Sequence, residues 1–136
     1  MPVFATDEQL YASLRILFGR IEAENPQASD ALLKSRLSFR FRCSEPDAVL
    51  VIDARQRPLH ITYGLNNSVK PDLDVQLSTD TLHQILLGQL SLTKALGSKQ
   101  LVPTGPVWKT MVLADLFQHA KTIYPQVLQE QGLGSL

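Results

Sequence analysis

Four short segments between residues 37 and 77 carry strand patterns, and no helical pattern separates them. The clearest segment is residues 37–43, where Phe39 and Phe41 alternate with Arg40 and Arg42. A period of two residues gives a strand one apolar face and one wet face. We therefore predict consecutive strands in one sheet, with both phenylalanines buried and both arginines reaching water.

The other strand patterns follow closely along the chain. They cover residues 48–52, 59–63 and 73–77, and a fifth strand is predicted over residues 98–103. Turns are predicted at residues 45–47 and 55–58, and a loop at 64–71. A sheet with one wet face is usually antiparallel and covered by helices on its other face. We expect a mostly antiparallel, five-stranded sheet.

Helical patterns occupy the two ends of the chain. Thr6 and Gln9 form a capping box ahead of an amphipathic helix that should end before Pro26. Helices that lie outside the run of strands favour an α+β fold over a βαβ fold. At 136 residues, the chain has the usual length of a single domain, which we place at residues 1–136.

Three helices are predicted in the second half. Residues 78–87 form one that is closed by Gly88, and residues 91–96 form a short one that is closed by Gly97. The last helix is predicted to begin at Pro106, to kink or restart at Pro125, and to fray from Gln131 onward.

Charge and cysteine content exclude several classes of protein. Thirteen basic residues balance 13 acidic ones, so the basic excess of a nucleic-acid-binding protein is missing. The single cysteine, Cys43, favours a reducing compartment. The N-terminus lacks the pattern of a signal peptide, and no apolar run is long enough to span a bilayer. We expect a cytoplasmic protein without a transmembrane segment.

Candidate catalytic and metal-binding residues are few. His119 follows Asp115 by four residues on one helix face, but no third ligand accompanies the pair, and a solvated face is the favoured interpretation. Cys43 continues an apolar alternation and is interpreted as a core residue. His60 is placed on a wet strand face and His83 among polar neighbours. We predict no catalytic residue, no metal site and no cofactor.

Charged side chains also share the wet face of the sheet. Arg40 and Arg42 are expected near Asp74 and Gln76 of another strand. Cross-strand surface pairing is the favoured interpretation, and an anion site is the weaker alternative.

The second half carries a large set of apolar residues at helical spacing. Pattern alone makes them core residues, and periodicity does not distinguish a filled core from the wall of a cavity. The set is Leu82, Ile85, Leu86, Leu92, Leu96, Trp108, Val112, Leu116 and Phe117.

Residues 72–105 carry a specific order of features: a strand, an apolar helix ending at Gly88, a short helix with a central Ala95, a strand and then Gly105. This order resembles the sterol carrier protein type 2 domain family. The family often has a glycine where this chain has Lys99, and its following strand usually lacks a proline such as Pro103.

The resemblance implies helices packed on one face of the sheet and an apolar cavity between them. Members bind sterols, acyl chains or other lipids without chemistry. The nine apolar residues named above become the expected ligand-binding wall. Near the mouth, Gln118 and Arg42 are conceivable partners for a head group.

Three functional hypotheses follow. The first is non-enzymatic binding or transfer of a fatty acyl chain, a sterol-like molecule or an isoprenoid lipid. The second is an interaction module, acting as a homodimer or as an accessory part of a lipid-related biosynthetic complex without transfer activity. The third, ranked lowest, is an enzyme that uses Asp115 and His119.

Overall fold

A computed structural model describes residues 4–56, 59–64 and 70–133. Parts of the predicted turn at 55–58 and of the loop at 64–71 lie outside the described residues. The elements are α1 (Asp7–Glu24), η1 (Pro26–Ser29), α2 (Asp30–Ser35), β1 (Ser38–Ser44), β2 (Ala48–Asp53), β3 (His60–Tyr63), β4 (Leu73–Ser78), α3 (Thr79–Leu87), α4 (Leu92–Gly97), β5 (Leu101–Thr104), η2 (Val107–Leu113) and α5 (Ala114–Glu130).

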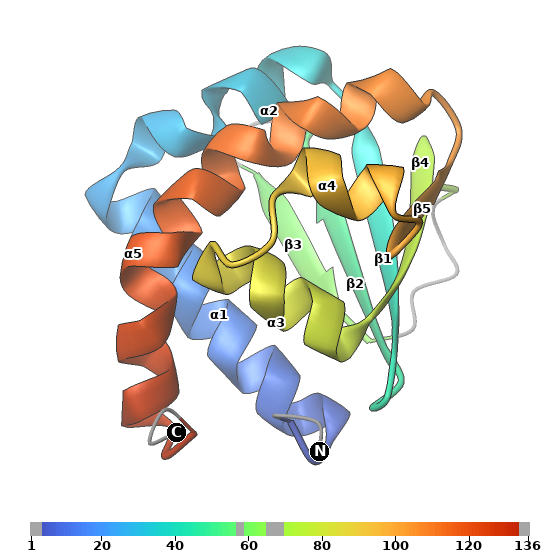
Figure 1. The fold of residues 1–136 in the computed structure, drawn as a ribbon. Coiled ribbons are helices and arrows are strands. Elements are labelled where there is room, and N and C mark those ends of the chain that lie inside the picture. Colours follow the sequence, from blue (N-terminus) through green and yellow to red (C-terminus); the bar gives the residue numbers. More distant parts are fainter. Residues whose placement is uncertain (1–3, 57–58, 65–69, 134–136) are drawn as a thin grey trace.

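The five strands form one sheet in the order β3-β2-β1-β4-β5, and the helices cover one face of it (Figure 1). Neighbouring strands are antiparallel except for β1 and β4, which are parallel. The α+β class and the mostly antiparallel sheet are therefore confirmed. The parallel pair arises because β2 and β3 extend the sheet on one side of β1, and β4 returns on the other side.

Strand β1 lies at the centre of the sheet with the predicted alternation. Phe39 and Phe41 are buried, Arg42 is exposed, and Arg40 is half-buried on the opposite face. Phe41 lies opposite Leu50 of β2 and Val75 of β4, so apolar side chains line up across three strands. This row forms the sheet side of the core.

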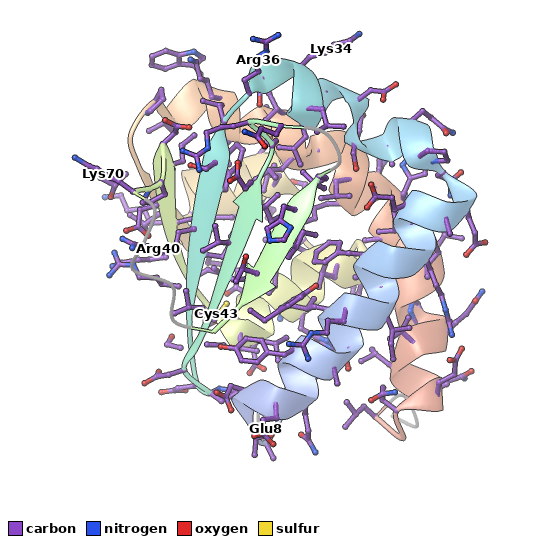
Figure 2. All side chains as sticks on the ribbon, turned by 180° about the vertical axis from the view of Figure 1, so that it is seen from behind. Glu8, Lys34, Arg36, Arg40, Cys43 and Lys70 are labelled. Carbon is purple, nitrogen blue, oxygen red and sulfur yellow. The ribbon has the colours of Figure 1, made fainter. Side chains whose placement is uncertain are left out.

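Asp74 of β4 holds the two arginines of β1 on the open face of the sheet. Arg42 Nε donates a hydrogen bond to Asp74 Oδ1 at 2.9 Å, and Arg40 Nη2 donates to Asp74 Oδ2. Burial alone would raise the pKa of Asp74, but the hydrogen bonds from Arg40 and Arg42 outweigh it, so the pKa lies below its usual value. Figure 2 shows Arg40 and Cys43 on the sheet as seen from this side. Cross-strand pairing, the favoured interpretation of these charges, is confirmed.

Hydroxyl side chains begin three of the helices as their sequences predict. Thr6 Oγ1 accepts from the Gln9 N–H, while Gln9 Oε1 accepts from the Ala5 N–H. The Ser78 and Ser91 hydroxyls likewise accept from backbone N–H groups three residues later. These caps satisfy N–H groups that have no partner inside the helix.

The end of α4 differs from the prediction. Gly97 lies within the helix, and the chain leaves it through Lys99, whose φ is +62°. The Lys99 N–H bonds to the Leu96 carbonyl and the Gln100 N–H to the Ala95 carbonyl, which is a Schellman motif. Because residues 98–100 form this turn, β5 begins at Leu101, later than predicted.

The last helix also differs from the prediction. Residues 107–113 form the 3₁₀ helix η2, and the α-helix begins only at Ala114. Pro125 lies inside α5 without ending it, because Tyr124, Val127 and Leu128 are buried around it and hold the helix on the core. After α5, Gly132 adopts φ +74° and the Leu133 N–H bonds to the Leu128 carbonyl.

Candidate functional site

A cleft of about 300 Å³ opens where α3, α4, η2 and α5 meet. Its wall combines apolar and polar side chains from segments that are distant in the sequence. The lining residues are Ile85, Gly88, Leu90, Ser91, Leu92, Thr93, Met111, Ala114, Asp115, Phe117, Gln118 and Lys121. Its volume falls at the small end of ligand pockets in proteins.

The floor of the cleft is apolar and continuous with the core. Ile85 of α3, Leu92 of α4 and Phe117 of α5 line it and are each buried. The Phe117 ring also meets Phe41 of β1 edge-on, with ring centroids 6.5 Å apart. Phe117 therefore lies between the cleft and the sheet.

The rim of the cleft on α5 is polar. Asp115, Gln118 and Lys121 follow one another every three residues, so they lie on one side of the helix. The methylenes of Lys121 pass close to Gly88 at the end of α3, where an added Cβ would lie 3.0 Å from Lys121 Cδ. Gly88 has φ +79°, so glycine suits both this backbone turn and the close approach.

The nine predicted wall residues divide into four groups. Ile85, Leu92 and Phe117 line the cleft, whereas Leu82, Leu86 and Leu116 are buried in the core behind it. Leu96 and Val112 are partly buried and pack against that core. Trp108 is 75% exposed and lies outside both the cleft and the core.

The two head-group candidates lie on opposite sides of the sheet. Gln118 is on the rim of the cleft. Arg42 is on the open face, bound to Asp74, and takes no part in the cleft. Lys121 on the rim was missed by the sequence analysis, although its spacing of three from Gln118 was a usable signal.

The Asp115 and His119 side chains do not form a pair. His119 Nδ1 lies 2.9 Å from the backbone carbonyl oxygen of Asp115, within the same helix. Within residues 4–56, 59–64 and 70–133, no group of three His, Cys, Asp or Glu side chains is placed to hold a metal ion.

Cys43 is buried among the apolar residues of the core. Burial raises the pKa of its thiol to about 12, although a hydrogen bond with Thr79 acts in the opposite direction. A thiol with that pKa is not a nucleophile at neutral pH.

His83 corrects one prediction. It was expected among polar neighbours, but it is half-buried between α3 and α5. Its Nδ1 lies 2.7 Å from the Tyr124 hydroxyl, and its ring meets Phe4 edge-on. Burial lowers the pKa of His83, so the neutral ring is favoured.

Comparison with known proteins gives one family. The family described as "SCP-2 sterol transfer family" matches residues 18–118. No curated protein sequence matches the chain significantly. None of the helices within the described residues is long and apolar enough to cross a membrane.

Solved structures share the fold at low sequence identity. Sterol carrier protein domain 2 of Helicoverpa armigera has 23% identity and a TM-score of 0.64, covering 84% of this chain and 89% of that one. Palmitated SCP2L2 of Aedes aegypti has 17% identity and a TM-score of 0.56, covering 79% and 92%. A structure described as "UbiJ-SCP2 Ubiquinone synthesis protein" has 18% identity and a TM-score of 0.55, covering 82% and 88%.

Proposed function

Because the chain belongs to the SCP-2 sterol transfer family, we propose that it binds and carries a hydrophobic small molecule without chemical change. Family membership supports lipid binding or transfer in general. The finer proposal is that the cleft between α3, α4, η2 and α5 is the entrance for a single acyl chain. The observation that carries it is the apolar floor of this cleft, continuous with the core and closed by Phe117.

The cleft alone is small, so a long chain must extend past Phe117. Rotation of this ring away from Phe41 would open the cleft toward the core over the sheet, whose side chains would have to move apart to admit the chain. Apolar surface transferred from water into the core gains about 25 cal/mol per Å², which drives entry. Leu82, Leu86 and Leu116 would then line the inner part of the site.

The rim favours a ligand with an anionic or hydrogen-bonding head. Lys121 and Gln118 stand at the mouth, where a carboxylate could meet an ammonium and an amide. Asp115 lies on the same rim but six residues before Lys121, so the head group is proposed to bind at the Lys121 end, away from that carboxylate. An acyl carboxylate fits this pattern better than a sterol, whose hydroxyl gains less from a cation. The description of the similar Aedes aegypti structure as palmitated supports the same ligand class.

Titration with a fluorescent fatty acid tests this proposal. We expect one site per chain and roughly micromolar affinity, about −8 kcal/mol. Ala114→Phe adds a ring to the cleft without entering the core and should lower the affinity at least tenfold. Ala23→Phe makes the same change at an exposed position of α1 and is the matched control. Absence of binding, or equal binding by all three proteins, would exclude the cleft as the entrance.

A second candidate function is an accessory role in a biosynthetic complex, with or without homodimer formation. The structural similarity to a protein described as a ubiquinone synthesis protein supports it. Native mass spectrometry of the purified protein, followed by lipid extraction, distinguishes the carrier function from the accessory function. Co-purified lipid favours the carrier, whereas a lipid-free dimer favours the accessory module.

We further propose that the protein is not an enzyme and acts in the cytoplasm. Two observations support the proposal that it is not an enzyme. The Cys43 thiol is buried with a raised pKa, and the Asp115 and His119 side chains do not form a pair. Zinc titration followed by calorimetry is the check. Stoichiometric micromolar binding that His119→Ala abolishes would restore the metal hypothesis.

A further inference from the structure

Apolar side chains are exposed on η2 beside the cleft. Among the described residues, the exposed large apolar side chains are Val102, Val107, Trp108 and Met111. Val102 lies with Arg42 and Gln76 on the open face of the sheet, whereas the other three belong to η2. We call Val107, Trp108 and Met111 the η2 patch.

The geometry of a 3₁₀ helix explains why Trp108 and Met111 are presented to solvent, whereas Val107 is exposed at the first position of the helix. Side chains three residues apart lie on the same face, so Trp108 and Met111 share one face. Thr110 and Leu113 share another and are buried. The helix is therefore anchored by one face and exposes an indole and a thioether on the other. Met111 also lines the cleft, so the patch adjoins the mouth of the proposed lipid site.

The charge around the patch is positive, although the chain as a whole is neutral. Residues 81–114 contain no Asp or Glu, and they carry Lys94, Lys99 and Lys109. Lys109 follows Trp108 directly, and Lys94 follows Thr93, whose hydroxyl contacts the Met111 sulfur at 4.0 Å. Both lysines are exposed.

Elements next to η2 add further basic side chains. Helix α2 packs against η2, and Figure 2 shows Lys34 and Arg36 projecting outward together where α2 ends and β1 begins. The acidic groups on α2 and α5 are Asp30, in the first turn of α2, Asp115, in the first turn of α5, and Glu130, at the far end of α5.

We propose that the η2 patch docks on the surface of an anionic lipid bilayer. Tryptophan is favoured in the interfacial layer of a membrane, and each lysine close to an anionic surface adds to binding. A protein partner is less favoured because protein interfaces are depleted in lysine and enriched in arginine. The two basic residues that directly follow Trp108 and the Met111 contact Thr93 are both lysine, Lys109 and Lys94. Docking here would bring the cleft against the bilayer, but it does not require the ligand proposed above.

Trp108 is the only tryptophan of the chain, so its fluorescence reports on the patch itself. Vesicles of phosphatidylcholine with and without phosphatidylserine are titrated into the protein. We expect a blue shift of Trp108 emission with the anionic vesicles, weakened by salt, and little change with the neutral ones. Flotation of the vesicles separates docking from lipid extraction, because a protein that only extracts a lipid monomer does not float with the bilayer.

Matched variants locate the docking surface. Each lysine near an anionic surface contributes about fivefold, so Lys94→Gln with Lys109→Gln should weaken flotation roughly 25-fold. Trp108→Ala, at an exposed position, should weaken it at least tenfold with unchanged thermal unfolding. The control is Arg20→Gln on α1, which removes one positive charge where the lysine variant removes two, so it should weaken flotation by much less than the roughly fivefold loss expected for one lysine of the patch. Arg20 pairs with Glu130 at the far end of α5, about 25 Å along that helix from η2.

The proposal is overturned if the wild-type protein neither shifts its emission nor floats with anionic vesicles. It is also overturned if Arg20→Gln weakens flotation about fivefold, as the loss of one patch lysine should, because charge anywhere on the surface would then suffice. Full binding by Trp108→Ala would equally exclude the η2 patch.

Discussion

Lys99 occupies the left-handed position that ends α4, where a side chain is strained. An L-residue in that conformation costs roughly 1–2 kcal/mol, and glycine escapes this cost but loses more entropy on folding. This is the position at which the sterol carrier protein family often has a glycine. The equivalent left-handed residues after α3 and α5 are Gly88 and Gly132.

We predict that Lys99→Gly stabilises the protein by about 0.5–1 kcal/mol, measured by urea unfolding. Lys99→Ala keeps the Cβ that causes the strain and should give no such gain. If both variants gain the same free energy of unfolding, the destabilisation at position 99 comes from the long lysine side chain and not from the left-handed backbone.

Phe41 connects the sheet to the helices. It is 1% exposed and contacts Phe117 of α5. We predict that Phe41→Ala lowers the free energy of unfolding by about 3–5 kcal/mol. Arg42→Ala, at the next position on the wet face, should cost no more than about 1 kcal/mol. Similar losses at the two positions would contradict the register of β1.

At the scale of elements, α3 and α5 are joined by a polar contact inside an apolar interface. His83 Nδ1 and the Tyr124 hydroxyl form it at 2.7 Å. Burial lowers the pKa of His83 in the folded state, and the charge of Asp80 opposes this only in part. Burial also raises the pKa of Tyr124, so its hydroxyl keeps its proton.

A depressed histidine pKa makes the unfolded chain bind more protons than the folded protein as the pH falls below about 6.5. The stabilisation by neutral His83 is therefore complete above pH 6.5 and is lost progressively below it, toward the folded pKa. We predict that His83→Gln flattens the pH dependence of the unfolding midpoint in this window. His60→Gln, on an exposed strand position, should leave the wild-type dependence intact. If His83→Gln leaves the slope of the unfolding midpoint against pH unchanged, this pH dependence arises from other titratable groups.

The order of elements also decides which contacts are possible. Because β1 and β4 are parallel neighbours, Asp74 lies within reach of both Arg40 and Arg42. Helices α3 and α4 lie side by side over the sheet (Figure 1). The cleft lies where α3, α4, η2 and α5 meet, so all of its walls come from elements that follow β4 in the chain.

At the scale of the whole molecule, binding in an internal site must stabilise the fold. A ligand at 100 times its Kd adds about 2.7 kcal/mol of stability if it binds only the folded protein. We predict that a long-chain fatty acid raises the melting temperature by roughly 10 °C under these conditions. Acetate, which has the same head group without the chain, should cause no shift. Saturating binding without a change in melting temperature would mean that the fatty acid binds the unfolded chain as well as the folded protein, which contradicts a site that exists only in the fold.

Much of this fold is encoded locally. The alternation at residues 37–43, the caps at Thr6, Ser78 and Ser91, and the glycine after α3 each depend on side chains within a few residues. Local patterns therefore determined the strands, most helix boundaries and the α+β class. They did not predict η2, because its pattern of apolar residues does not differ from that of a first turn of the last α-helix. They did not predict the left-handed Lys99, because glycine is the usual residue in that conformation and Gly97 stands two residues earlier.

The candidate site was determined only by tertiary structure. Periodicity grouped Trp108 with Phe117 as apolar residues, yet one lies in solvent and the other closes the cleft. The same side chain serves as core, cavity wall or exposed patch according to what packs opposite it, and that partner comes from a distant segment. For the same reason, only the tertiary structure shows that Lys121 of α5 and Met111 of η2 line the same cleft. The sequence by itself determined which residues are apolar, and the packing of the helices decided which of them water or a ligand can reach.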